Sequence, residues 1–362
     1  MKDTHSKKDY SPAYLRLYSQ MRSKIVSGSY PLGSKLPSKR TIAEEAGVSV
    51  VTAEHAYALL CDEGYIEARQ RSGYFVCFRT DDGFASAPTG AMPAVQPHHL
   101  SDTPEFPFSI LARTMRSVIS DHGEGILERS PNPGCVQLRQ AIARYLARSR
   151  NITAEPEQII IGSGAEYLYS LVVSMLGRGR SYAIEAPSYP MIRQVYGAAD
   201  VKLQMLPLGT DGIESPALWA SCADILHISP YRSFPSGITA SASKRHEYLR
   251  WADAGERYIV EDDFESEFSV SRKPEETLYC LTSRENVIYM NSFSKTVSPS
   301  LRVGYMVLPK SLLPAFEKAA GFYSCTVPTY IQLVLAALLE SGDFERHINR
   351  VRRQKRKALS DK

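Results

Sequence analysis

The stretch LPSKRTIAEEAGVSVVTAEHAYALLCDEG, residues 36–64, decides the fold of the N-terminal part of the chain. Ser38 stands where a helix N-cap belongs and Gly47 where a C-terminal glycine belongs, so a short helix is predicted between them. Ser49 then starts another helix, which ends at Gly64. One face of that second helix carries Ala53, Ala56, Tyr57 and Leu60. The stretch therefore predicts two helices joined by a short turn.

The flanking sequence completes this small domain. Upstream, apolar residues recur at three- and four-residue spacing from Tyr14 to Ile25, which indicates an amphipathic helix. Downstream, the β-prone runs YIEA and YFVCF flank RQRSG, which favours a hairpin. Three helices followed by a hairpin is the order of a winged helix-turn-helix, a DNA-binding fold.

A helix-turn-helix places the start of its second helix in the major groove, where side chains meet base edges and phosphates. Here that helix starts at Ser49, and the hairpin tip could reach a neighbouring groove. The residues predicted to contact DNA are Ser38, Arg40, Ser49, Thr52, Arg69, Arg71 and Gly73. Periodicity alone leaves open a small helical domain with a solvated hairpin.

The run from Leu17 to Val76 resembles the winged helix-turn-helix of the GntR family of bacterial regulators nearly end to end. The resemblance implies that residues 9–78 form a domain that binds a double-stranded DNA operator. Two departures lie in the recognition helix. Val50 stands where the family often has arginine, and Glu54 where another basic residue can occur.

The composition is that of an ordinary globular protein, with 43% hydrophobic and 23% charged residues and a net charge of +4 over 362 residues. The six cysteines include no CxxC pair, so neither a zinc site nor a dense disulfide framework is expected. The N-terminus lacks the apolar core of a signal peptide, and no apolar stretch has membrane-spanning length. We therefore expect a soluble, cytoplasmic protein.

A change of composition separates this domain from the rest of the chain. Residues 79–107 are rich in proline and in small and polar residues, which predicts a linker. Beyond it, the apolar runs IIIG, YAIE, ILHIS, YIVE, VIYM and VGYMVL alternate with helical stretches. This alternation indicates βα units and a mainly parallel sheet in a second domain, residues 108–345.

Lys295 is the first candidate for chemistry in the second domain. It lies in SFSK, just past the strand-like VIYM, and cofactors bind at strand ends in open parallel sheets. A lysine in a partly desolvated site loses its proton more easily and can form a Schiff base with an aldehyde. Taken alone, the motif is also compatible with a surface lysine.

Other residues at strand ends supply what pyridoxal phosphate needs besides a lysine. Asp262 follows YIVE and is placed to pair with the pyridine nitrogen, and Tyr189 follows YAIE and could stack on the ring. Arg302 offers a bidentate phosphate clamp. A phosphate can also bind the helix start formed by Ser163, Gly164 and Ala165. The combination predicts a pyridoxal phosphate site.

Residues 106–353 resemble the large domain of fold-type I aminotransferases, most closely the MocR subgroup of GntR regulators. The matching stretches are NPGCVQLRQAIARYLARSR, GSGAEYL, APSYP, FPSG, EDDFESEF and SFSKTVSPSLRVGY. The resemblance implies an α/β fold of a winged helix-turn-helix joined to a pyridoxal-phosphate-dependent transferase-like domain, and a homodimer. It assigns Lys295 as the catalytic lysine and Gly164, Ser292 and Arg302 to the phosphate site.

The predicted pocket departs from that pattern at three places. Phe264 replaces a tyrosine whose hydroxyl would bond the phenolic oxygen of the cofactor, a bond worth roughly 1.5 to 3 kcal/mol. Tyr231, Arg232 and Ser233 replace Ser-His-Gln, and Ala165 replaces a hydroxyl residue. Arg232 is therefore predicted to supply the missing partner; the alternatives are that it meets an effector carboxylate or lies on the surface.

The sequence ends at Lys362, inside a basic helix that in the relatives leads into a C-terminal lobe. Residues 346–362 are predicted to be the start of that lobe, which in the relatives supplies an arginine for the substrate carboxylate. The run RVRRQKRKALSDK could alternatively be a nucleic-acid-binding tail.

These observations predict a transcription regulator that uses a cofactor-bound domain to sense a small amine or amino acid. One alternative is a working aminotransferase, which needs Lys295 as a proton shuttle and a site for the substrate carboxylate. Because Phe264 replaces the expected tyrosine, little or no transaminase activity is expected. Another alternative is a DNA-binding fragment that uses no cofactor.

Overall fold

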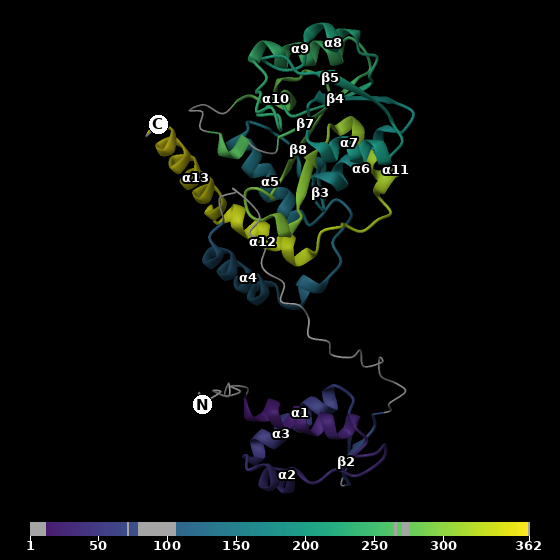
Figure 1. Cartoon of the computed structure of the whole chain (residues 1–362), viewed down its shortest axis with the longest axis vertical. Helices are drawn as coiled ribbons and strands as arrows, with labels where there is room; N and C mark the ends of the chain where they lie inside the picture. The colour runs from purple at the N-terminus through teal and green to yellow at the C-terminus, as the bar shows by residue number, and fades with distance from the viewer. Residues whose placement is uncertain (1–11, 71, 79–105, 264–265, 270–274, 361–362) are drawn as a thin grey trace, which may run out of the picture. The chain divides into compact units, whose positions relative to one another are not determined.

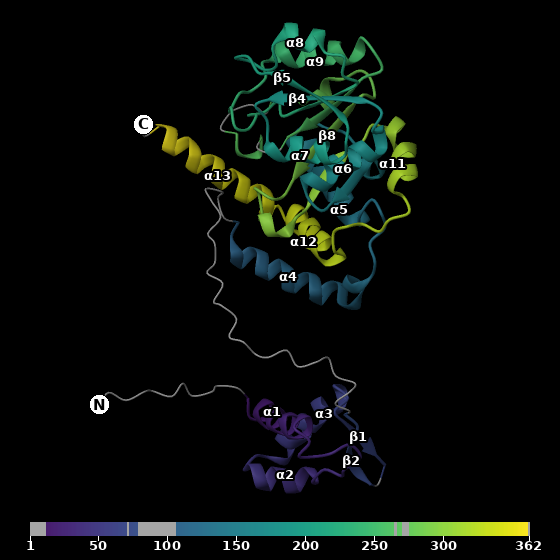
Figure 2. The ribbon, with the colours of Figure 1, turned by 45° about the vertical axis from the view of Figure 1, so that its right-hand side comes forward.

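The computed structural model describes residues 12–70, 72–78, 106–263, 266–269 and 275–360. The chain divides into two compact units, Met1–His99 and Leu100–Lys362 (Figures 1 and 2). Arg71, Phe264 and most of the predicted linker lie outside the described residues. Of the predicted linker, Phe106 is buried in the larger unit and Pro107 precedes its first helix.

The smaller unit has the predicted order of three helices and a hairpin. Its elements are α1 (Ala13–Val26), α2 (Lys39–Ala46), α3 (Val50–Asp62), β1 (Ile66–Arg69) and β2 (Gly73–Val76). Ser38 and Ser49 are the N-caps of α2 and α3, and Gly47 ends α2 in the left-handed conformation at φ 64°. The predicted winged helix-turn-helix is thereby confirmed.

The core of the smaller unit forms where the apolar stripes of its helices meet. Buried side chains of α1 and α3 make up most of it, namely Leu17, Met21, Ile25, Ala53, Ala56, Tyr57 and Leu60. Lys35 pairs with Phe75 of β2 in an isolated antiparallel bridge, so the segment before α2 runs along the hairpin. Burial of the α3 stripe fixes which residues of this helix face outward.

The larger unit is built on a mainly parallel seven-stranded sheet, counted over the described residues. Its strands are β3 (Ile159–Gly162), β4 (Ser181–Ala186), β5 (Lys202–Pro207), β6 (Ile225–Ile228), β7 (Tyr258–Asp262), β8 (Val287–Ser292) and β9 (Gly304–Val307). The order across the sheet is β3-β9-β8-β7-β6-β4-β5. Only β9 runs antiparallel to its neighbours β3 and β8. The predicted sheet is confirmed, with β5 as an additional strand.

Helices cover both faces of this sheet (Figures 1 and 2). The helices are α4 (Phe108–His122), α5 (Val136–Ser149), α6 (Ala165–Leu176), α7 (Pro190–Ala198), α8 (Ser215–Ala220), α9 (Ala242–Asp253), α10 (Leu278–Leu281), α11 (Leu313–Ala320), α12 (Thr329–Glu340) and α13 (Asp343–Ser360). Side chains of α6, α7 and α11 pack on one face of the sheet, and those of α5, α9 and α12 on the other.

Because side chains alternate along each central strand, these strands contribute residues to the helix layers on both faces of the sheet. In β7, Val260 packs against the α6 side, whereas Ile259 packs against the α9 side. The next residue on the α6 side is Asp262, and Glu261 and Asp263 fall on the opposite side. The last residues of β7 therefore direct carboxylates to both faces of the sheet.

The strand directions bring distant residues to one edge. The carboxyl ends of the parallel strands share that edge, and the antiparallel β9 begins there, because Gly304 pairs with both Gly162 and Ser292. The loop before β9, which contains Arg302, therefore lies near the ends of β3 and β8. This edge is the place where cofactors bind in open α/β sheets.

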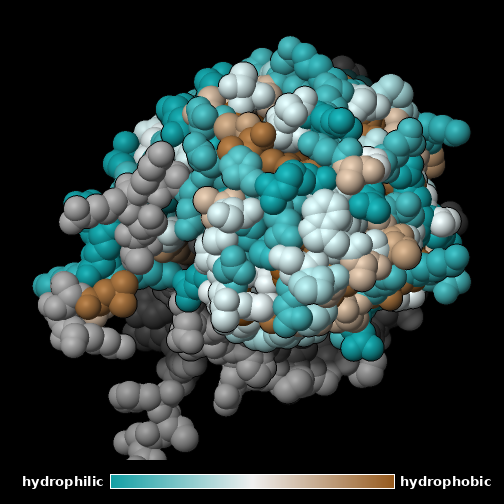
Figure 3. Space-filling model, turned by 90° about the horizontal axis from the view of Figure 1, so that it is seen from above, coloured by the Kyte–Doolittle hydropathy of each residue, from teal (hydrophilic) through white to brown (hydrophobic). Residues whose placement is uncertain are grey.

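The helix α13 closes the described chain. It crosses the boundary predicted at residue 346, and its Ile348 and Val351 belong to the core of the larger unit. The face that carries α8 and α9 is mostly hydrophilic, with apolar atoms in small separate areas (Figure 3). Within the described ranges, no helix combines the length and the apolar character needed to cross a membrane.

Candidate functional site

The predicted DNA-contacting hydroxyls also cap the helices of the smaller unit. Ser49 Oγ accepts a hydrogen bond from the Thr52 amide at 3.1 Å and lies 2.8 Å from Thr52 Oγ1. Ser38 Oγ makes the equivalent contacts with Thr41, at 3.1 and 2.7 Å. Such caps satisfy amides that would otherwise lack partners at the helix start. The side-chain oxygens of Ser38 and Ser49 therefore stabilise the first turns of α2 and α3.

Two basic residues, Lys39 and Arg40, begin the helix α2. Arg40 is exposed in the first turn of α2. Its neighbour Lys39 forms an ion pair with Glu54 of α3 at 2.6 Å, which lowers the pKa of Glu54. The carboxylate of Glu54 is thus ionised at neutral pH and neutralised by a neighbour.

The hairpin carries the remaining predicted contacts. Arg69 is exposed, pairs with Glu67 at 2.7 Å, and lies over the ring of Phe75. Gly73 has a φ of 107°, and a Cβ added there would lie 3.1 Å from the Lys35 Cε. The absence of a side chain at Gly73 thus makes room for Lys35 beside the hairpin.

In the larger unit, Arg302 lies against the start of α6. A Cβ added to Gly164 would come within 3.1 Å of the Arg302 Nη2. Gly164 has φ 96° and ψ 176°, a conformation reserved almost entirely for glycine. Arg302 is itself left-handed, at φ 51° and ψ 47°. Both backbones are uncommon, and such conformations cluster at binding sites.

The guanidinium of Arg302 contacts a carboxylate at this position. Its Nη2 donates to Glu166 Oε2 at 2.7 Å, and Glu166 lies in the first turn of α6. Beside this pair, the Ser163 amide donates to Thr326 Oγ1 at 3.1 Å. The start of α6 thus combines helix amides with a cation, an arrangement suited to an anion.

Asp262 is held by two aromatic side chains from neighbouring elements. Tyr169 of α6 donates its hydroxyl to Asp262 Oδ2 at 2.5 Å, and His227 Nε2 of β6 lies 3.6 Å from the same oxygen. Burial and the charge of Asp262 raise the pKa of Tyr169 well above its usual value, so its hydroxyl keeps its proton. Asp262 itself is 4% exposed.

His227 is positioned by its other ring nitrogen. Tyr196 Oη lies 2.7 Å from His227 Nδ1, while Nε2 has no hydrogen-bond partner among the described residues. This buried nitrogen lies near the Asp262 carboxylate but beyond hydrogen-bond distance of it, at 3.6 Å. Tyr169 and His227 were not predicted from the sequence, because nothing in the spacing of α6 or β6 points to Asp262.

Tyr189 lies close enough to Asp262 and Arg302 for their charges to affect its pKa. It is half-buried at the N-terminus of α7, with its ring 6.1 Å from that of Phe234. Burial raises the pKa of Tyr189; Glu166 and Asp262 raise it further, and Arg302 lowers it. The predicted nitrogen partner, Asp262, and the predicted phosphate clamp, Arg302, therefore both affect the predicted ring-stacking residue.

Lys295 lies in a turn three residues beyond the end of β8 and is half-buried. The turn is closed by a hydrogen bond from the Val297 amide to the Phe293 carbonyl at 2.9 Å. Ser292 is the last residue of β8, and its amide donates to the Asn291 side chain at 2.6 Å. Both predicted residues thus lie at the same sheet edge as Asp262.

Arg232 lies in the loop after β6. It is exposed and adopts the left-handed conformation at φ 71°. Its neighbours Tyr231 and Ser233 are buried and donate to Glu261 at 2.7 Å and to Glu185 at 2.7 Å. The residues on both sides therefore anchor the loop, while Arg232 is exposed.

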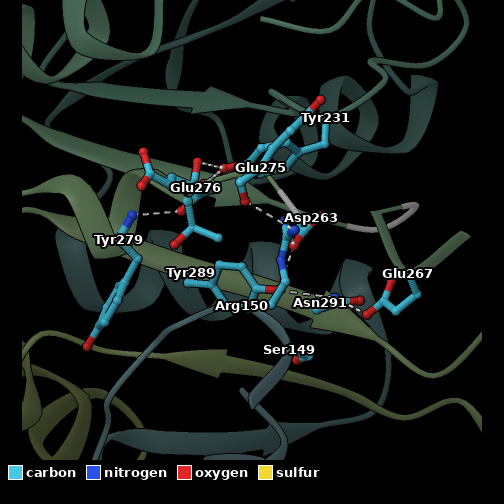
Figure 4. Close-up of polar contacts among 12 residues, drawn as sticks. Ser149, Arg150, Tyr231, Asp263, Glu267, Glu275, Glu276, Tyr279, Tyr289 and Asn291 are labelled. Atoms are coloured by element: carbon cyan, nitrogen blue, oxygen red, sulfur yellow. Dashed lines mark hydrogen bonds and ion pairs between the residues drawn. The ribbon is translucent and has the colours of Figure 1, made fainter. Parts of the chain in front are cut away.

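A buried polar network supports these strand ends from the opposite face (Figure 4). Arg150 pairs with Asp263 at 2.5 Å, and Tyr289 donates to the same carboxylate oxygen at 2.7 Å. Asn291 donates to Glu267 at 2.7 Å. Since Asp263 follows Asp262 and Asn291 precedes Ser292, the network fixes the ends of both β7 and β8.

Together, these residues form the donor set that a phosphorylated pyridine aldehyde requires. A carboxylate for a ring nitrogen, a cation with helix amides for a phosphate, an aromatic ring and a lysine all lie at one sheet edge. Because Gly164 has no side chain, the Arg302 guanidinium can lie close to the start of α6. The site fits pyridoxal phosphate in charge and in chemistry.

Two family models match the chain. Residues 105–361 match the family "Aminotransferase class I and II", whose members use pyridoxal phosphate. Residues 13–76 match "Bacterial regulatory proteins, gntR family", regulators that bind DNA.

Several curated proteins match nearly the whole chain. The HTH-type transcriptional regulator YdeL of Bacillus subtilis is 32% identical over 96% of this chain and 77% of its own length. The probable rhizopine catabolism regulatory protein MocR of Rhizobium meliloti is 29% identical over 94% of this chain and 74% of its own length. The chain spans about three quarters of these relatives.

Solved aminotransferase structures share the fold of the larger unit. The crystal structure of the multiple substrate aminotransferase from Thermococcus profundus superposes with a TM-score of 0.63 at 24% identity. The match covers 69% of this chain and 66% of that one, just under two thirds of the solved chain. At this identity the comparison shows the fold alone.

Proposed function

The chain belongs to the MocR-type GntR transcription regulators, which join an HTH domain to an aminotransferase class I and II domain, and we propose that it binds pyridoxal phosphate to sense a small amine or amino acid. A ligand that exchanges at Lys295 would alter the arrangement of the DNA-binding domains on a double-stranded operator. A homodimer belongs to the proposal, with the cofactor site at the interface between the two subunits.

The observation that carries this proposal is the joint geometry at the start of α6 and the end of β7. Arg302 faces Gly164 where a phosphate would bind, and Asp262 is buried with Tyr169 donating to it. A structural ion pair alone would not require a glycine-only backbone at Gly164. In the proposal, the first contact would hold the phosphate and the second would hold the pyridine nitrogen of the same ligand.

Each residue has a physical role in this proposal. Asp262 would pair with the protonated pyridine nitrogen, and the hydrogen bond from Tyr169 would orient the carboxylate. Tyr189 would cover one face of the ring. Ser163, Gly164, Ala165 and Ser292 would surround the phosphate together with Arg302. The cofactor would supply an aldehyde that reacts reversibly with amines, and Lys295 would hold it covalently between such exchanges.

The test is the visible absorption of the purified full chain with pyridoxal phosphate. Wild type should develop a band that borohydride removes, leaving a stable adduct on Lys295. Lys295→Ala should lose both the band and the adduct. Lys310→Ala, which removes a surface lysine paired with Glu155, is the matched control and should keep both. No band with excess cofactor and no adduct on Lys295 would falsify the proposal.

A further inference from the structure

The outward face of the recognition helix α3 is apolar where it begins. Val50 is 46% exposed and Val51 is 63% exposed, and both lie in the first turn. Val51 lies on the side of the helix opposite the buried Ala53, Ala56 and Tyr57, and Val50, at the first position of the helix, lies beside that buried face. Isolated exposed valines are ordinary on protein surfaces. An adjacent pair at the part of the fold that enters the major groove has a specific consequence.

Two other side chains in the first two turns make contacts within the protein. The Thr52 hydroxyl lies against Ser49 in the cap. The His55 ring packs edge-on against Tyr14, with the centroids 5.8 Å apart. Glu54 can accept hydrogen bonds but cannot donate them while ionised. The outward positions 50, 51 and 54 therefore offer no donor to the acceptors of a guanine edge.

We infer that Val50 and Val51 read thymine methyl groups in the major groove. The thymine methyl is the one apolar group on the major-groove edges of the four bases, and apolar side chains recognise it by contact. This inference rests on the DNA binding contained in the proposed function and adds its base preference. The proposed ligand of this apolar face is thus a DNA operator that contains thymine.

The charged residues near Val50 and Val51 are also suited to binding DNA. Arg40 in the first turn of α2 and Lys35 beside the hairpin are exposed and can meet phosphates. Glu54 would be repelled by the DNA backbone, but the Lys39 ion pair at 2.6 Å offsets its charge. The paired carboxylate can still accept a hydrogen bond from a cytosine amino group. The helix therefore combines an apolar tip with flanking cations.

The experiment starts from the full chain and a random-sequence duplex library. Duplexes enriched by binding are resynthesised with deoxyuridine in place of thymidine at each conserved position, which removes one methyl group and changes nothing else in the major groove. Affinities are measured for wild type and for a Val50→Ala/Val51→Ala double variant. Val26→Ala, which truncates an exposed valine at the end of α1, is the matched control.

At one or two positions, uracil should weaken wild-type binding about fourfold, the effect of one buried methyl group. The double variant should bind the thymine duplex correspondingly more weakly and lose its preference for thymine over uracil. Val26→Ala should keep that preference. Sequence-specific binding that is indifferent to uracil overturns this inference alone. Absence of any enriched sequence overturns the inference and the proposed operator binding together.

Discussion

Arg302 holds the carboxylate of Glu166 at the place where the proposed phosphate would bind. The Glu166 carboxylate and the cofactor phosphate would both interact with the Arg302 guanidinium, so each would weaken the interaction of the other. The pair is partly solvent-exposed, 55% for Arg302 and 27% for Glu166, so its strength is modest. In the proposed site, Glu166 would therefore lower the affinity for the cofactor.

Replacing Glu166 with glutamine should therefore strengthen cofactor binding. An ion pair of this exposure is worth 0.2–1 kcal/mol, so the dissociation constant for pyridoxal phosphate should fall by up to about fivefold. Absorbance titration measures it. Glu340→Gln breaks a comparable pair with Arg144 in a different part of the unit and should change nothing. Weaker binding by Glu166→Gln would mean that the carboxylate supports the site.

Side-chain partners are the part of the site that the sequence did not reveal. Asp262 and Arg302 could be named because each follows a recognisable strand or motif. Tyr169, His227 and Glu166 could not, because their contacts depend on how α6 and β6 rotate against β7. Such rotation is set by the packing of the whole layer rather than by local spacing.

At the scale of elements, α6 begins in a conformation that constrains the site. Gly164 combines φ 96° with a neighbouring guanidinium 3.1 Å from any added Cβ. A side chain here would strain the backbone and push Arg302 away from the helix start. If the proposed phosphate site is correct, the start of α6 therefore needs glycine at position 164.

Gly164→Ala should destabilise the larger unit by about 1–3 kcal/mol and weaken cofactor binding. Gly179→Ala is the matched control, since a Cβ there meets nothing within 4 Å and the backbone is not left-handed. Denaturant unfolding and cofactor titration measure the two effects. If Gly164→Ala is as stable and binds as well as Gly179→Ala, the start of α6 is not a constrained cradle.

The elements themselves were largely predictable. The caps at Ser38, Gly47 and Ser49 are local signals, and their predicted helices formed where expected. The strand β5 was missed because its run KLQMLP has a mixed apolar and polar pattern at the edge of the sheet. An edge strand is less buried than a central one, so its sequence carries a weaker apolar signal.

At the scale of the whole molecule, the larger unit contains buried carboxyl groups that make its stability depend on pH. Burial and the charge of Asp263 raise the pKa of Glu267 from 4.5 to about 7. As pH rises from about 4.5 to 7, Glu267 ionises in the unfolded chain but stays protonated in the folded one. The free energy of unfolding therefore falls across this window.

Glu267→Gln should remove that fall. Its amide oxygen can still accept from Asn291, and the NH₂ group replaces an oxygen that has no partner in the described structure. Relative to wild type, the free energy of unfolding of the variant should rise by about 1–3 kcal/mol as the pH is raised from 4.5 to 7. It should rise no further above pH 7. Denaturant unfolding at several pH values measures this, with the exposed Glu155→Gln as control. A stability difference that does not change with pH would show that Glu267 is ionised in the fold.

The central claim joins the two units, because an amine that reacts at the cofactor should change DNA binding. The most direct measurement is the affinity of the cofactor-loaded full chain for an enriched duplex, titrated with candidate amines and amino acids. For wild type, one ligand class should shift this affinity by about 5- to 150-fold, the usual range of coupling between sites, and Lys295→Ala should show no shift. An equal shift in both proteins, or an unchanged affinity in wild type for every amine that alters its cofactor spectrum, would contradict the account.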